Sequence, residues 1–146
     1  MIMIENATID NIKRLLEIEK YSFGEDSYPL SKRAFLYHIK KGDRVFVAKN
    51  GEKISGYVLI FRYSKSFRIY SIATSKECRG KGVAKKLINF CMDRAKKEGK
   101  ETISLEVAES NKKARELYES FGFREYRAIP SYYPQGDTGY KMRAKL

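Results

Sequence analysis

The chain has 146 residues, of which 42% are hydrophobic, and its formal net charge is +12. This size is typical of one folded domain, here residues 1–146, with enough apolar surface for a core. No apolar run approaches the ~20 residues of a membrane span, and the amino end lacks a signal peptide's layout, so we expect a cytoplasmic protein that contacts no membrane. Two cysteines and one histidine offer almost no ligands for a metal site or for a Cys-His nucleophile.

The positive charge would attract nucleic acid, anionic cofactors or acidic protein surfaces, and does not choose among them. The basic residues are dispersed over every segment, and the sequence contains no K/R-G-F-G-F run typical of RNA-binding domains. A non-catalytic nucleic-acid-binding module is therefore the alternative that we rank last, and nucleic acid is not expected as a direct substrate.

The first half of the chain predicts an edge strand, two helices and three consecutive antiparallel strands. Asn6 or Thr8 can cap a first helix, in which Ile, Leu and Glu19 follow helical spacing. After turn-forming residues at 24–29, Ser31 can cap a second helix. Asn50-Gly51 is a hairpin signal between strand-like runs. The expected strands are residues 1–5, 44–49, 53–63 and 67–74.

A glycine-containing stretch at residues 78–84 joins the last of these strands to a third helix. Apolar residues recur at every fourth position from Val83 to Ala95, which is typical of an amphipathic helix ending near Gly99. Gly80 and Gly82 permit a tight turn, and the first N–H groups of a helix favour an anion. The spacing fits neither a dinucleotide fingerprint nor a nucleoside-triphosphate loop. The pattern alone also fits an ordinary strand-to-helix turn.

The second half predicts a strand at 102–107, a helix and two final strands at 123–129 and 138–144. The first of these strands alternates, which places Glu106 on the face opposite to its aliphatic residues. Ser110-Asn111 can cap the helix, and Gly122 can end it. The expected fold class is α/β, or α+β with a mixed sheet, in which helices cover largely antiparallel strands.

The glycine stretch resembles a known cofactor loop. Arg79, Gly82 and Ala84 spell Arg-x-x-Gly-x-Ala, which is similar to the pyrophosphate loop of the GCN5-related N-acetyltransferase (GNAT) superfamily. The order of predicted elements resembles this superfamily over the whole chain. The resemblance implies the GNAT acyl-CoA N-acyltransferase fold, with a mostly antiparallel, seven-stranded central sheet flanked by four helices.

A second match resembles one subfamily. Residues 105–111 read Leu-Glu-Val-Ala-Glu-Ser-Asn, and Leu117-Tyr118-Glu119 and Gly122-Phe123 follow. This pattern is similar to the signature of the RimI subfamily, which acetylates the N-terminal alanine of a ribosomal protein. Tyr132-Tyr133-Pro134 favours the same branch, which includes archaeal and eukaryotic enzymes that modify α-amines.

The resemblance implies a role for each matching residue. Glu106 would be the general base and Tyr118 the general acid. An acetyl-CoA site would comprise the backbone of the third antiparallel strand, the glycine loop with the start of the helix after it, and the residue that caps the last helix. These residues are Ile72, Ala73, Thr74, Arg79, Gly80, Lys81, Gly82, Val83, Ala84 and Asn111. The acceptor would be bound by Ser71, Tyr132 and Tyr133.

Each of these roles has a simpler alternative. Glu106 could be a solvated strand residue, Tyr118 a core aromatic residue, Asn111 only a helix cap, and the two tyrosines packing residues. The chain also departs from the subfamily. Residues 71–74 read Ser-Ile-Ala-Thr in place of Asn-Ile-Ala-Val, position 108 is Ala where Arg is frequent, and residues 24–28 lack a Phe-Pro-Trp pattern. These departures concern acceptor specificity more than catalysis.

The resemblance therefore implies an acetyl-CoA-dependent enzyme that acetylates a protein N-terminal α-amine, such as that of a ribosomal protein, by direct attack in a ternary complex. A second hypothesis within the same fold is acetylation of a lysine or of a small-molecule amine. An α-amine has a pKa of about 7.7–8.0 and a lysine one of about 10.4, so a single carboxylate base suits the α-amine better.

Overall fold

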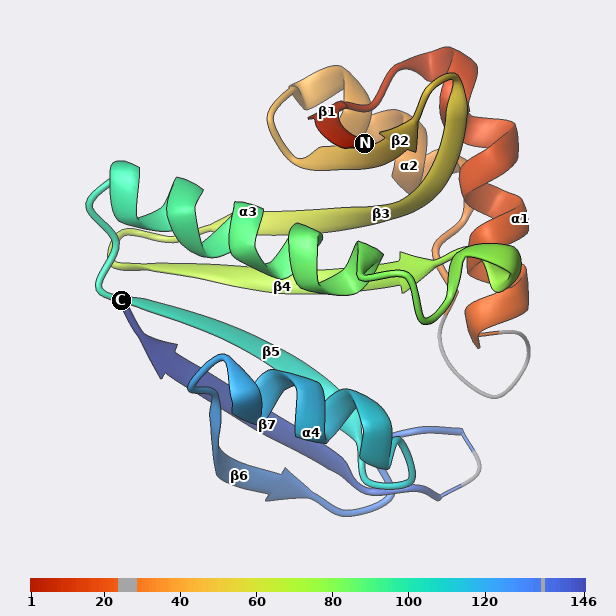
Figure 1. Cartoon of the computed structure of the whole chain (residues 1–146). Coiled ribbons are helices and arrows are strands. Elements are labelled where there is room, and N and C mark those ends of the chain that lie inside the picture. Colours follow the sequence, from red (N-terminus) through yellow and green to blue (C-terminus); the bar gives the residue numbers. More distant parts are fainter. Residues whose placement is uncertain (24–28, 135) are drawn as a thin grey trace. The chain divides into compact units, whose positions relative to one another are not determined.

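The computed structural model describes residues 1–23, 29–134 and 136–146 (Figure 1). The chain divides into two compact units, and each combines segments that are distant in sequence. Unit 1 comprises residues 1–60 and 71–90, and unit 2 comprises residues 61–70 and 91–146. The departure from Phe-Pro-Trp noted at residues 24–28 lies outside the described residues, as does most of the predicted turn at 24–29.

The predicted fold class is confirmed: seven strands form one sheet in the order β1-β2-β3-β4-β5-β7-β6, accompanied by four α-helices. β4 and β5 run parallel, whereas β1 with β2, β2 with β3, β5 with β7 and β6 with β7 are antiparallel. The strands are β1 (Ile2–Asn6), β2 (Val45–Asn50), β3 (Lys53–Arg62), β4 (Ser66–Thr74), β5 (Thr102–Ala108), β6 (Arg124–Ile129) and β7 (Gly139–Lys145). The helices are α1 (Ile12–Phe23), α2 (Lys32–Lys41), α3 (Val83–Lys97) and α4 (Lys112–Ser120).

The ends of the elements in unit 1 follow local sequence signals. A short 3-10 turn at Ile9–Asn11 precedes α1, with Thr8 as its N-cap, and the Ser31 side chain accepts a hydrogen bond of 3.1 Å from the Ala34 N–H at the start of α2. The β2–β3 loop is Gly51-Glu52, one residue later than predicted, because Asn50 pairs with Lys53. Gly51 takes a φ of +65° there, which suits glycine.

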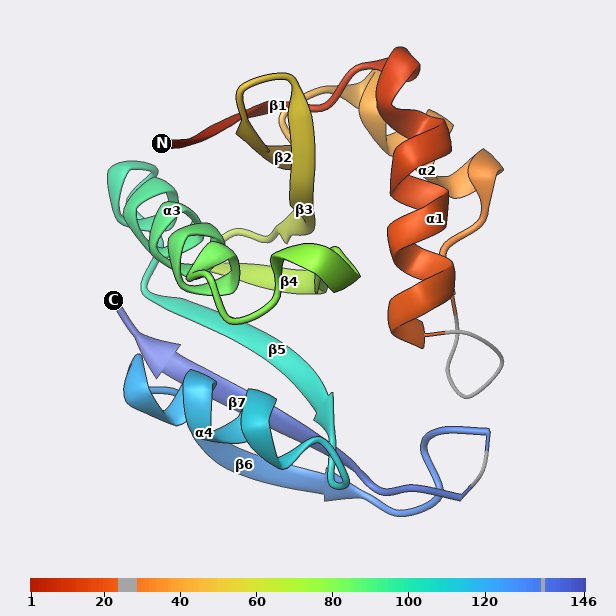
Figure 2. The ribbon, with the colours of Figure 1, turned by 45° about the vertical axis from the view of Figure 1, so that its right-hand side comes forward.

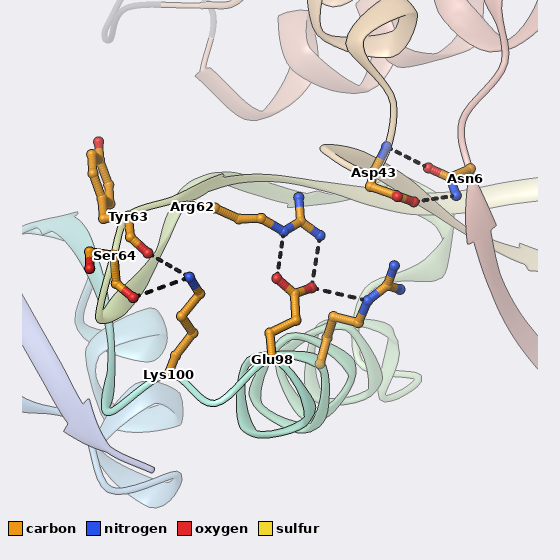
Figure 3. Close-up of polar contacts among 8 residues, drawn as sticks. Asn6, Asp43, Arg62, Tyr63, Ser64, Glu98 and Lys100 are labelled. Atoms are coloured by element: carbon orange, nitrogen blue, oxygen red, sulfur yellow. Dashed lines mark hydrogen bonds and ion pairs between the residues drawn. The ribbon is translucent and has the colours of Figure 1, made fainter.

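Two close contacts hold the strands of unit 1 against their neighbours. A Cβ on Gly56 of β3 would lie 2.7 Å from the Ala73 carbonyl oxygen and 3.0 Å from a Val83 methyl group, so this position requires glycine. Asn6, at the end of β1, exchanges hydrogen bonds of 3.1 and 3.2 Å with Asp43, before β2 (Figure 3). At Gly56, β3 thus passes close to both Ala73 of β4 and Val83 in the first turn of α3.

Unit 2 has one apolar and one polar sheet face. Ile103, Leu105 and Val107 are buried, whereas Glu106 lies on the opposite face, as the alternation predicts. In both views α4 lies over β7, with β5 on one side and β6 on the other (Figures 1 and 2). At the other end of the unit, Glu98 accepts hydrogen bonds of 2.9 and 3.2 Å from Arg62 (Figure 3).

Candidate active site

Glu106 lies at the point in unit 2 where β4 and β5 stop pairing. The parallel register covers Ser66 to Ile69 of β4, and ends with Ile69 opposite Leu105. Glu106 is the next residue of β5, and its side chain is 15% exposed. Oε1 accepts a hydrogen bond of 2.5 Å from Arg68, and Oε2 lies 3.9 Å from Nζ of Lys141. The Glu106 carboxylate thus lies at the end of the strand pairing, between two basic side chains.

Arg68 is a site residue that the sequence analysis did not single out. It lies on β4 opposite Ser104, and its guanidinium also stands 5.4 Å from the Tyr70 ring centre. Although burial opposes its charge, the nearby Glu106 carboxylate and Tyr63 hydroxyl raise the pKa of Arg68. The alternation of residues 67–74 is a signal that could have predicted Arg68 on the polar face of its strand. It could not have predicted the contact with Glu106, which lies 38 residues away in the sequence.

The two tyrosines that precede Pro134 adjoin Glu106. The Tyr132 hydroxyl donates a hydrogen bond of 3.0 Å to Oε1 of Glu106. The Tyr133 ring packs edge to face against Tyr132, with centres 5.1 Å apart. Burial and the charge of Glu106 raise the pKa of Tyr133, and Tyr118 is another of its electrostatic neighbours. The structure thus brings four predicted residues of unit 2, Glu106, Tyr118, Tyr132 and Tyr133, into one neighbourhood.

A cavity of about 210 Å³ opens beside the Glu106 carboxylate. Its lining is polar and basic, and all of it comes from unit 2: Tyr63, Arg68, Ser104, Leu105, Glu106, Tyr126 and Lys141. This volume holds a small side chain or the end of a peptide. The cavity gives a substrate group access to Glu106.

Tyr118 lies on the buried face of α4 and not on its solvent-exposed face. Its ring packs against Phe123 with centres 6.0 Å apart, and 8% of the residue is exposed. Burial raises the pKa of Tyr118 to about 12, so the phenol keeps its proton at neutral pH. A protonated phenol can donate to a thiolate, as the predicted general acid must. The same burial equally supports a packing role.

The glycine loop of unit 1 has the geometry of an anion site. Gly80 and Gly82 have φ values of +77° and +82°, and space is open where a Cβ would stand on either. α3 begins at Val83, and its first intrahelical hydrogen bond runs from the Lys86 N–H to the Gly82 carbonyl. The N–H groups of the first turn are therefore available to a phosphate.

The two basic residues of this loop are exposed. The Arg79 guanidinium lies 4.9 Å from the centre of the Tyr21 ring and 3.4 Å from the Ser22 hydroxyl, both on α1, and Lys81 is also exposed. The N–H groups, glycines and cationic side chains of this loop fit the diphosphate of an acyl-CoA, and Ala84 lies in the first turn of the helix.

The remaining cofactor candidates have local structural roles as well. β4 continues to Thr74 and so includes Ile72 and Ala73, beyond the end of its pairing with β5. Asn111 is the N-cap of α4, and its Oδ1 accepts a hydrogen bond of 3.3 Å from the Ala114 N–H. Capping explains Asn111 without a ligand, so its contact with the cofactor stays a prediction.

Ser71, the predicted acceptor residue of unit 1, belongs to a polar cluster that the sequence analysis missed. Its hydroxyl lies 2.8 Å from the Tyr57 hydroxyl and 3.4 Å from Oε1 of Glu19. Glu19 is only 2% exposed. The signal was present in the sequence, because Glu19 continues the apolar stripe of α1. A carboxylate at such a position is either solvated at a helix edge or buried with partners.

Residues 1–23, 29–134 and 136–146 contain no group of three or more His, Cys, Asp or Glu side chains that could hold a metal ion. Within the same ranges, none of the helices has the length and apolar character needed to cross a membrane.

Comparison with known proteins assigns the class. The model of the Acetyltransferase (GNAT) family matches residues 9–123, and the chain therefore belongs to this family. It is an acyltransferase of the N-acetyltransferase type, with acetyl-CoA as the acetyl donor. This agrees with the resemblance found in the glycine loop and in residues 105–123.

Several of the relatives are named for α-amine acetylation. An N-alpha-acetyltransferase of Saccharolobus solfataricus is 29% identical over 157 residues, covering 98% of this chain and 92% of that protein. A [ribosomal protein bS18]-alanine N-acetyltransferase of Haemophilus ducreyi is 28% identical over 137 residues, covering 92% and 91%. The crystal structure of Ard1 from Thermoplasma volcanium matches the fold with a TM-score of 0.91 at 20% identity, covering 99% of this chain and 97% of that one.

Proposed function

We propose that this chain acetylates the N-terminal α-amine of a protein, such as a ribosomal protein, in the cytoplasm. The observation that carries the proposal is the setting of Glu106, whose carboxylate is 15% exposed, adjoins a cavity and accepts a hydrogen bond from Tyr132. The names of the relatives from Saccharolobus solfataricus and Haemophilus ducreyi support an α-amine acceptor.

Bound acetyl-CoA supplies the acetyl thioester, and the protein contributes binding and proton transfer. The first turn of α3 and the loop at 79–84 hold the diphosphate through backbone N–H groups. The edge of β4 at 72–74 would hold the pantetheine arm, and its N–H groups would supply hydrogen bonds to the thioester oxygen. Glu106 accepts a proton from the attacking amine, directly or through water. Tyr118 would supply the proton for the leaving thiol, and the acetyl group would pass directly to the amine without a covalent enzyme intermediate.

The acceptor is held by the tyrosines and by Ser71. Tyr132 and Tyr133 present an apolar ring surface and hydroxyl groups beside Glu106, which suits the first residues of a peptide. Deprotonating a lysine at neutral pH costs about 3 kcal/mol more than deprotonating an α-amine, at about 1.36 kcal/mol for each pKa unit. A single carboxylate base therefore favours the α-amine.

The test begins with thermal stability in the presence and absence of acetyl-CoA. A ligand that binds only the native state at about 100 times its dissociation constant adds about 2.7 kcal/mol. Turnover is then measured on peptides that differ in their first residue, alongside lysine peptides with blocked N-termini and polyamines. Acetylation confined to free N-termini supports the proposal, and acetylation of only the lysine peptides or polyamines overturns it.

The role of Glu106 is tested with Glu106→Gln. We expect its turnover to fall by roughly 10²-fold or more, the usual contribution of a general base, while the thermal shift with acetyl-CoA is retained. Glu116→Gln, at an exposed position on α4, is the matched control and should keep wild-type turnover. An unchanged rate in Glu106→Gln would remove this carboxylate from the mechanism.

A further inference from the structure

Glu19 is the one charged side chain of the described chain that is buried in the core. It lies on α1 in unit 1 and is 2% exposed. Its Oε1 accepts a hydrogen bond from the Tyr57 hydroxyl of β3, and its Oε2 accepts one of 2.5 Å from the Leu30 N–H. Burial of a carboxyl group lowers the stability of the fold unless hydrogen bonds replace those lost to water.

The partners of Glu19 form a connected cluster. The Ser71 hydroxyl of β4 lies 3.4 Å from Oε1 of Glu19 and 2.8 Å from the Tyr57 hydroxyl. The Phe35 ring of α2 packs edge to face on Tyr57, with centres 5.4 Å apart, and fixes its position. A triangle of one carboxylate and two hydroxyls therefore links α1, β3 and β4 within unit 1.

Among residues 1–23, 29–134 and 136–146, the hydrogen-bond partners of Glu19 are all uncharged groups. They are Tyr57 from β3, Ser71 from β4 and the Leu30 N–H, which precedes α2. Lys76 and Arg79 reach α1 at Tyr21, with distances of 5.6 and 4.9 Å to its ring centre. Burial raises the pKa of Glu19 to about 7, so the carboxyl changes charge near neutral pH.

The charge of Glu19 decides which way the hydroxyls point. An ionised carboxylate can only accept, so Tyr57 and Ser71 must direct their protons toward the cluster. The lone pairs of the Ser71 oxygen are then free to accept an N–H from an incoming amine. A neutral Glu19 donates one hydrogen bond itself, which reverses the direction of the chain and leaves Ser71 as a donor.

We propose that Glu19 is a positioning residue for the acceptor amine and acts through Tyr57 and the Ser71 hydroxyl. The inference rests on the proposed function, because it gives Ser71 the acceptor contact stated there. Activity would then depend on the ionisation of Glu19 in unit 1 as well as on Glu106. It also gives a physical reason for a carboxylate in the apolar stripe of α1.

The test compares the KM for an N-terminal peptide across pH in wild type, Glu19→Gln, Ser71→Ala and the double variant. In Glu19→Gln the amide oxygen can still accept from the Leu30 N–H, but the side chain cannot ionise. We expect its KM at pH 8 to be raised roughly fivefold, the scale of one hydrogen bond, with kcat within twofold. Ser71→Ala should have the same effect, and the double variant should show no further loss.

The pH dependence separates positioning from a structural role. Wild-type KM should rise as the pH falls through about 7 and approach that of Glu19→Gln, beyond the change that the peptide's own α-amine causes in every variant. Glu17→Gln, at an exposed position on the same helix, is the matched control. Equal KM values and pH profiles in wild type and Glu19→Gln, or additive effects of the two substitutions, would overturn the inference.

Two outcomes identify which proposal fails. If wild type acetylates no N-terminal peptide, both the function and this inference fall. If wild type acetylates peptides and the variants match it, only the inference falls. Should Glu19→Gln not fold, Ser71→Ala decides alone, because an unchanged KM and pH profile in that variant would exclude the Ser71 hydroxyl from acceptor binding.

Discussion

The hydroxyl of Tyr132 lies 3.0 Å from Oε1 of Glu106, although the two residues are 26 positions apart. Gly139, the first residue of β7, makes this contact sterically feasible. A Cβ at Gly139 would stand 2.6 Å from the Tyr132 ring, so this glycine leaves the space that the ring occupies. The space left by Gly139 thus allows the Tyr132 hydroxyl to reach the candidate base, Glu106.

We predict that Tyr132→Phe lowers kcat/KM for the acceptor peptide by roughly five- to tenfold, because one hydrogen bond to Glu106 is lost while the ring remains. The melting temperature should change little, since Tyr132 is partly exposed. Tyr126→Phe is the control, because this tyrosine lines the same cavity and its ring packs against Arg143. Equal losses in both variants would contradict a specific role for Tyr132.

For Tyr118→Phe we predict a fall in kcat of roughly 10²-fold with the fold preserved, because phenylalanine keeps the packing against Phe123 but cannot donate a proton. The buried phenol has a pKa of about 12, so its proton is present below that pH. The wild-type rate should therefore show no alkaline decline from this group up to about pH 10. Thermal unfolding and kcat are measured on the same preparations, and a loss of stability without a loss of rate would assign Tyr118 to packing.

The stability of the protein should depend on pH through Glu19. Its pKa is about 7 in the folded chain and 4.5 for an unperturbed glutamate, so the native state holds a proton that the unfolded state has released. This contribution to stability is complete below about pH 4.5 and is lost as the pH rises through about 7. At about 1.36 kcal/mol for each pKa unit, the upper limit is about 3 kcal/mol.

Denaturant unfolding between pH 4.5 and 8 measures this effect. Glu19→Gln should flatten the pH dependence of the unfolding free energy, whereas Glu17→Gln should leave it as in wild type. An unfolding free energy that changes with pH by the same amount in all three proteins would contradict the assignment to Glu19.

The two cysteines should differ in reactivity. Cys91 is completely buried, and burial raises the pKa of its thiol to about 12, so little thiolate exists at pH 8. The neighbouring polar groups of Ser75 and Ser55 lower the pKa of Cys78. We expect iodoacetamide to modify Cys78 first in the native protein and Cys91 only on unfolding, as peptide mass mapping can show. Equal labelling of both thiols in the folded state would be inconsistent with this structure.

Features that depend on neighbouring residues could be predicted from the sequence. Capping by Ser31 and Asn111, the alternation that exposes Glu106 on one face of β5, and the start of α3 after Gly82 all follow from residues within a few positions. The shift of the β2–β3 loop by one residue shows the limit of this reasoning, because the strand register, and not the Asn50-Gly51 pair alone, sets the turn.

The roles of Glu19 and Arg68 required the tertiary structure. Glu19 matched the apolar stripe of α1 by spacing, but only the arrangement of α1, β3 and β4 brings it to Tyr57 and Ser71, 38 and 52 positions away. Arg68 meets Glu106 because β4 and β5 are parallel neighbours. The sequence by itself determined the elements, their helix caps and the family signature, since these rest on local hydrogen bonding and periodicity. The tertiary structure decided which charges are buried and paired, because burial and pairing depend on which distant segments pack together.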